Sequence, residues 1–133
     1  MNFIFAHKST KPEILGTAII RGSFEFQGQK CSAASRAYIP ESLWSDTKEF
    51  MLKELKTVTM GPAEEFTNFM NAVIDAAAFR DITGYIDFAK EADDAEIIFG
   101  GGYDDSKGYF IEPTLIVTTN PKFKTMAEEI FGP

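Results

Sequence analysis

The stretch FQGQKCSA at residues 26–33 interrupts a helical pattern and joins it to a predicted strand. Upstream, apolar side chains recur over residues 12–26 at the spacing of one helix face. Gly28 ends this pattern, because glycine permits tight backbone bends that other residues resist. Small residues after Cys31 then lead into a strand at residues 36–39. The stretch therefore predicts a helix–turn–strand unit with a single cysteine in the turn.

Helices and strands alternate along the rest of the chain. Predicted strands lie at residues 2–6, 36–39, 95–99 and 110–118, and predicted helices at residues 12–26, 40–57 and 75–92, with a helical turn at 124–128. Asp75 has the position and residue type of an N-cap. Such alternation predicts an α/β domain with helices packed on a partly parallel sheet.

Length and composition exclude several classes of protein. The chain has 133 residues, which suits one domain, and a net charge of -7, which disfavours a nucleic-acid partner because phosphate binding needs clustered cations. No apolar run approaches the ~20 residues needed to span a membrane. No histidine or cysteine spacing typical of a metal site occurs, so no metal is expected.

Cys31 is the first candidate for chemistry, although a lone cysteine is more often an inert, buried residue. Its neighbours favour reactivity, because Gly28 lets the backbone bend tightly and the small residues at 32–34 leave little bulk around it. Backbone N–H groups in such a turn can stabilise a thiolate or an oxyanion. His7, the only histidine, lies far upstream and is expected to be structural. The residues alone thus indicate an α/β domain with one thiol that could be activated.

The glycines at residues 100–102 do not indicate a phosphate site. A phosphate-binding glycine loop opens a helix, whereas these glycines lead toward a predicted strand. A hairpin-type connection is expected there. Adjacent acidic pairs, such as those at residues 93–94 and 104–105, are interpreted as solvated charge because neighbouring side chains point in different directions.

Three motifs, in order, resemble the aldehyde dehydrogenase superfamily: FQGQKCSA at residues 26–33, GYFIEPT at 108–114 and EEIFGP at 128–133. Further short stretches of the sequence are similar to one subfamily, the pyrroline-5-carboxylate dehydrogenases. They are GQKCSA followed by Ser35 and Arg36, SLW at residues 42–44, AVIDA at 72–76 and DDS at 104–106. The resemblance spans nearly the whole chain and implies a fragment of the catalytic domain of that family.

The resemblance also implies a reaction. The Cys31 thiolate would attack the aldehyde carbon of glutamate γ-semialdehyde, the open form of pyrroline-5-carboxylate, and the Cys31 backbone N–H would help to hold the oxyanion. Hydride transfer to NAD would leave a thioester, and a glutamate-activated water would release glutamate. By position, Glu129 would bind the nicotinamide ribose, Phe131 would pack on the nicotinamide and Ser32 would help to hold the substrate carboxylate.

From the residues alone, Ser32 could equally cap a turn and Phe131 could equally be a core residue. The chain also departs from the family, which carries its general-base glutamate before the segment matching Asn2. The NAD-binding domain and the region after residue 133 are likewise outside the sequence. Ala78 and Asp81 stand where many members place Gln and Lys, so no cofactor contact is carried over to them. Residues 1–133 are therefore expected to be a partial catalytic domain, inactive alone.

Two other functions stay open at this point. One is another aldehyde dehydrogenase with a different aldehyde substrate, and the other is a non-catalytic, stand-alone binding module with an unreactive Cys31. Under the main interpretation the partners are a small-molecule aldehyde and copies of the parent protein in a homo-oligomer. Bacterial cytoplasm and mitochondrial matrix are both compatible compartments, and the single cysteine agrees with a reducing one.

Overall fold

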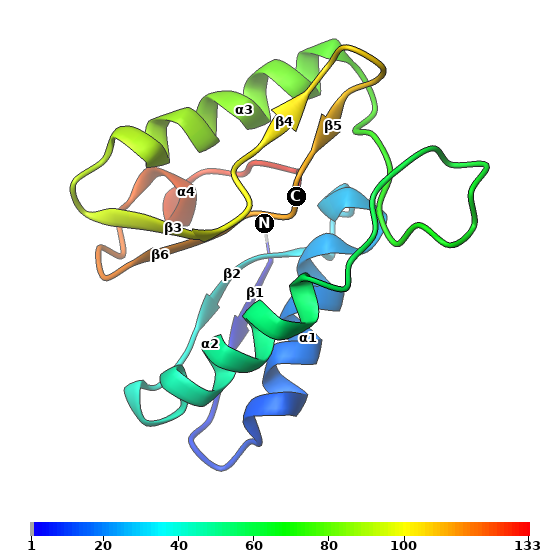
Figure 1. Cartoon of the computed structure of the whole chain (residues 1–133). Coiled ribbons are helices and arrows are strands. Elements are labelled where there is room, and N and C mark those ends of the chain that lie inside the picture. The colour runs from blue at the N-terminus through cyan, green and yellow to red at the C-terminus, as the bar shows by residue number, and fades with distance from the viewer. Residues whose placement is uncertain (1) are drawn as a thin grey trace.

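A computed structural model describes residues 2–133 and divides them into two halves (Figure 1). The first half contains β1 (Asn2–Phe5), α1 (Pro12–Phe24), the 3-10 helix η1 (Glu25–Gly28), β2 (Ala34–Tyr38) and α2 (Glu41–Leu55). The second half contains α3 (Ala76–Glu91), β3 (Ala95–Phe99), β4 (Tyr103–Asp104), β5 (Phe110–Ile111), β6 (Leu115–Thr118) and α4 (Lys124–Ala127).

In the first half, β1 and β2 form a parallel pair, and α1 is the connection between them. Parallel neighbours need such a crossover, because a tight turn can join only antiparallel strands. Helices α1 and α2 pack against each other and, with Ile4 and Ala37 of the strands, enclose one apolar core. Its buried members are Ala6, Leu15, Ile19, Ile20, Phe24, Met51, Leu55 and Met70.

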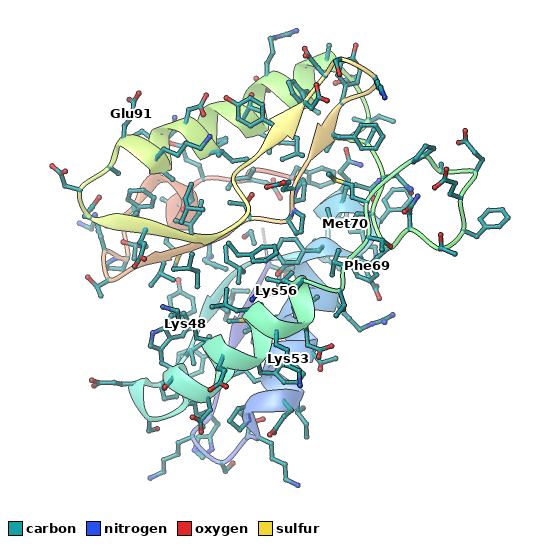
Figure 2. All side chains as sticks on the ribbon, viewed as in Figure 1. Lys48, Lys53, Lys56, Phe69, Met70 and Glu91 are labelled. Atoms are coloured by element: carbon teal, nitrogen blue, oxygen red, sulfur yellow. The ribbon has the colours of Figure 1, made fainter. Side chains whose placement is uncertain are left out.

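A protruding loop joins the two halves. It starts after α2, and an isolated bridge between Met60 and Met70 closes its base. Met70 is fully buried where the chain turns back toward the halves (Figure 2), whereas Phe66 near the loop's tip is 97% exposed. The side chain of Asn71 donates a hydrogen bond to the Gly61 carbonyl at 3.0 Å. Side-chain and backbone bonds therefore fix this loop at its base.

In the second half, α3 packs on a long antiparallel ribbon in which β3 pairs with β6 and β4 pairs with β5. The buried core of this half consists of Val73, Phe79, Ile82, Ile86 and Ile111. As predicted, Asp75 is the N-cap of α3, because its carboxylate accepts a hydrogen bond from the Ala78 N–H at 2.8 Å. Helix α3 thus begins where the sequence indicated.

The prediction of one continuous strand over residues 110–118 was wrong. This stretch divides into β5 and β6, and buried Pro113, which lacks an N–H to donate, lies in the break between them. Gly100 and Gly101 have φ values of 71° and 87° and turn the chain from β3 into β4. The glycines thus precede a strand, as expected, and the hairpin tip lies further on, at residues 105–109.

The α/β class with a partly parallel sheet is confirmed, with the parallel pairing in β1 and β2 and antiparallel pairing in the second half. Some boundaries differ from the sequence prediction, because α1 ends at Phe24 and β2 already begins at Ala34. Within residues 2–133, none of the helices is long and apolar enough to cross a membrane.

Replacing Asp75 tests the start of α3. Asp75→Ala removes the acceptor for the Ala78 N–H and should lower the free energy of unfolding by about 1 kcal/mol, while Asp75→Asn should retain most of the cap. Urea unfolding of both variants measures this difference. Asp81→Ala, on an exposed position within α3, is the matched control, and an equal loss there would contradict the capping role.

Candidate active site

Cys31 lies in a tight turn between η1 and β2. The turn is closed by the Ala33 N–H, which donates to the Lys30 carbonyl at 3.0 Å. The Cys31 thiol is free and the residue is exposed, as is Ser32 beside it. The Asn2 side chain donates to the Cys31 carbonyl at 2.6 Å and so fixes the turn to the start of β1. Cys31 therefore differs from the buried cysteine that is the usual case.

The backbone before Cys31 is strained. Phe26, Gln27 and Gly28 have φ values of 55°, 57° and 67°, all in the left-handed region. Glycine adopts this conformation freely, whereas each other L-residue loses roughly 1–2 kcal/mol there. Phe26 and Gln27, two such residues in succession, need compensating contacts, and strain of this kind clusters at functional sites.

Two glutamine side chains supply those contacts. Gln27 is buried and donates to the Ala72 carbonyl at 3.2 Å, and Gln29 accepts a hydrogen bond from the Ile74 N–H at 2.9 Å. Both partners lie just before α3, so the cysteine turn is attached to the second half of the molecule. The sequence prediction missed these residues, although the two glutamines flanking a glycine were a visible signal.

The cation nearest Cys31 in sequence is already paired. Lys30 donates to the Glu25 carboxylate at 3.1 Å, and Arg21 forms a second ion pair with Glu25. The hydrogen bond from Lys30, with the positive charges of Arg21 and Lys30, lowers the pKa of Glu25. Lys30 therefore shares one carboxylate with Arg21.

Strand β1 begins at Asn2, and His7 follows its other end. The His7 ring forms a hydrogen bond with the Ser9 hydroxyl at 2.9 Å. Because Asn2 is the β1 residue that contacts Cys31, a full strand separates His7 from the thiol. Residues 2–133 form no Cys–His couple, and among them no three His, Cys, Asp or Glu side chains gather as a metal site would require.

The segment at residues 128–133 meets the cysteine turn backbone to backbone. A Cβ on Gly28 would lie 2.7 Å from the Gly132 carbonyl oxygen, so only glycine fits this approach. Gly132 in turn lies against Ile82 of α3, where a Cβ would collide with the isoleucine side chain. Phe131, which directly precedes Gly132, has a φ of 61°. Two of the three sequence motifs are thus in direct contact.

A cleft of about 790 Å³ separates the two halves. Its walls include residues 33–39 around β2, residues 114–118 around β6 and the final segment, residues 129–133. Glu129 and Phe131 both line this cleft, and Phe131 is 43% exposed. Lys30 and Ala33 line it too, which places Cys31 and Ser32 at its margin rather than on its walls.

The chain belongs to the aldehyde dehydrogenase family, because the sequence profile described as "Aldehyde dehydrogenase family" matches residues 2–133. It is similar to the mitochondrial Delta-1-pyrroline-5-carboxylate dehydrogenase of Dictyostelium discoideum, with 49% identity over 132 residues that cover 99% of this chain and 24% of that protein.

Two solved structures extend the similarity to three dimensions. The Delta-pyrroline-5-carboxylate dehydrogenase of Mycobacterium tuberculosis matches with a TM-score of 0.92 and 40% identity, over 99% of this chain and 24% of that one. The 1-pyrroline-5-carboxylate dehydrogenase from Thermus, with bound NAD, matches with a TM-score of 0.91 and 31% identity, over 99% and 25%. The chain therefore spans about a quarter of the length of these relatives.

Replacing Gly28 tests the contact between the two motifs. Gly28→Ala combines a left-handed φ with a clash against the Gly132 and Ser23 carbonyls and should lower the free energy of unfolding by about 2 kcal/mol or more. Gly84 is an exposed position on α3, where an added Cβ would have no atom within 4 Å. Gly84→Ala should therefore raise the free energy of unfolding by up to about 1 kcal/mol. Thermal unfolding measures both, and similar values for the two variants would contradict the close approach.

Proposed function

We propose that this chain is the cysteine-bearing part of an NAD-dependent dehydrogenase that oxidises glutamate γ-semialdehyde to glutamate in proline degradation. The observation that carries the proposal is the Gly28–Gly132 contact, which joins the exposed Cys31 turn to the cleft segment with Glu129 and Phe131. The similarity to Delta-1-pyrroline-5-carboxylate dehydrogenases over 99% of the chain supports the choice of substrate.

Cys31 is the nucleophile in this proposal. Its exposed Sγ, as a thiolate, attacks the aldehyde carbon, a C–S bond forms, and the carbonyl oxygen becomes an oxyanion beside the Cys31 backbone N–H. Loss of hydride from that carbon leaves a thioester on Sγ. Attack by water then releases the carboxylate product and restores the thiol. Ser32, which is exposed next to the nucleophile, donates a hydrogen bond to the substrate carboxylate in this proposal.

Glu129 and Phe131 form the part of the NAD site that this chain supplies. A carboxylate suits the ribose hydroxyls, which donate hydrogen bonds, and a partly exposed aromatic ring suits the flat nicotinamide. Both side chains line the same cleft, so the residues fit the nicotinamide end of the cofactor. When bound there, NAD supplies the hydride acceptor for the reaction. The structure of the Thermus relative with bound NAD supports this choice of cofactor.

The proposal also places these residues in a longer polypeptide. The chain spans about a quarter of its relatives' length, and neither a glutamate base motif nor a nucleotide-binding domain is within it. The isolated chain is therefore expected to be inactive. The full-length protein is proposed to be a homo-oligomer of the mitochondrial matrix or the bacterial cytoplasm, and the mitochondrial name of the Dictyostelium relative favours the former.

Steady-state kinetics on the full-length protein test this function. The wild type should reduce NAD with glutamate γ-semialdehyde more efficiently than with simple aliphatic aldehydes, and Cys31→Ser should lower kcat by roughly 10³-fold or more because the nucleophile is lost. The 133-residue chain, assayed alone, should produce no NADH above background.

Three results would count against the proposal. A preference for aliphatic aldehydes would point to another substrate, and an active Cys31→Ser variant would remove the cysteine from the mechanism. Steady NADH production by the 133-residue chain alone would show that the residues outside it are dispensable.

A further inference from the structure

Helix α3 contacts the final segment through a tyrosine that no sequence motif includes. The Tyr85 hydroxyl donates a hydrogen bond to the Glu128 carboxylate at 2.7 Å. By accepting this bond, Glu128 raises the pKa of Tyr85 above its ordinary value. The Lys124 ammonium lies 4.8 Å from the Tyr85 ring centre and 5.3 Å from that of Phe88, which ties α4 to the same face of α3.

A second contact holds the segment at its other end. Ile82 lies three residues before Tyr85 on the same face of α3, is 1% exposed, and packs where any side chain on Gly132 would collide with it. Gly132 is also held against Gly28. The two ends of residues 128–132 are therefore fixed on one helix, about one turn apart.

Glu129 and Phe131 lie between these two contacts. Phe131 has a φ of 61°, a conformation that a phenylalanine leaves unless its surroundings impose it. The contact at Gly132 acts on one side of this strained residue, and the contact at Glu128 acts on the other. We expect that releasing either end would let this backbone relax and move both side chains from their positions in the cleft.

We propose that Tyr85 is a positioning residue, which holds Glu128 so that Glu129 and Phe131 are presented to the nicotinamide riboside of NAD. The proposal rests on the proposed function, because it assumes that these two side chains contact the cofactor. Tyr85 also lines the cleft, but in this role it acts through the Glu128 carboxylate that accepts its hydrogen bond, and its effect reaches the site through the backbone of the final segment.

The chain offers a matched control. Tyr103 also donates its hydroxyl to a carboxylate, that of Asp87 on α3, at 2.9 Å. This pair is also exposed, and the Tyr103 side chain lies against Phe79 and Lys90 rather than against the final segment. Tyr103→Phe thus removes the same type of bond from the same helix without releasing Glu128.

The experiment compares Tyr85→Phe and Tyr103→Phe in the full-length protein by two measurements. Direct titration gives the Kd of NAD, and hydrogen–deuterium exchange without NAD reports the mobility of residues 128–133. Tyr85→Phe should raise the Kd roughly 3- to 10-fold and speed exchange in that segment, as expected for one lost hydrogen bond. Tyr103→Phe should change neither. Glu128→Ala should weaken NAD binding similarly, and adding Tyr85→Phe to it should produce no further loss.

An unchanged Kd in Tyr85→Phe, or equal increases in both tyrosine variants, would overturn the positioning role even if the enzyme is active. Additive losses in the double variant would overturn it as well. A wild-type protein that fails to bind NAD would instead contradict the proposed function. The exchange measurement then decides alone whether Tyr85 holds the segment: faster exchange confined to Tyr85→Phe supports it, and unchanged exchange refutes it.

Discussion

The contact between Gly28 and Gly132 is the constraint on which the rest of the site depends. It brings two backbones together at a distance that excludes even a methyl group. One backbone leads through Gln29 and Lys30 to the exposed Cys31, and the other carries Glu129 and Phe131 into the cleft. Because the contact is made by main chain, its geometry does not depend on rotamer choices. The main chain thus fixes the junction itself, and the side chains of Gln27, Gln29 and Ile82 attach it to α3 and the segment before it.

Strain accompanies this contact on both sides. Phe26 and Gln27 precede Gly28 in left-handed conformations, and Phe131 precedes Gly132 in another. Hydrogen bonds from buried Gln27 and from Tyr85 offset part of the cost. Strained residues persist only where their surroundings over-determine them. The concentration of such residues at one junction is consistent with a site whose geometry was selected for function rather than stability.

The two halves also show surfaces that suit a larger protein. Strands β1 and β2 are parallel, and parallel sheets are normally covered on both faces, yet Phe3 and Phe5 are 56% and 76% exposed. The cleft between β2 and β6 is likewise open to solvent on this chain alone. Both features agree with relatives about four times as long as the chain.

Much of the fold could be predicted from the sequence because it depends on local signals. Asp75 marked the start of α3, and helical spacing marked α1 and α2. The break at Pro113 was missed, since the apolar residues on either side of it were interpreted as one strand. The three motifs indicated Cys31, Ser32, Glu129 and Phe131 as site residues.

The arrangement of the site could not be predicted in the same way. The Tyr85–Glu128 bond joins residues 43 positions apart, and the Gln27 and Gln29 bonds each span 45. Contacts of that separation follow from tertiary packing, which local pattern does not encode. The left-handed run before Cys31 depends on the same contacts, so it too was beyond local reasoning.

The most direct test of the account is whether the substrate becomes attached to Cys31 during turnover. The full-length protein would be mixed with NAD and glutamate γ-semialdehyde, quenched in acid within the first turnover, digested and analysed by mass spectrometry. The account predicts a glutamyl thioester on the peptide that contains Cys31, lost when quenching is delayed until substrate is exhausted. Sustained oxidation with that peptide unmodified at every time point would contradict it.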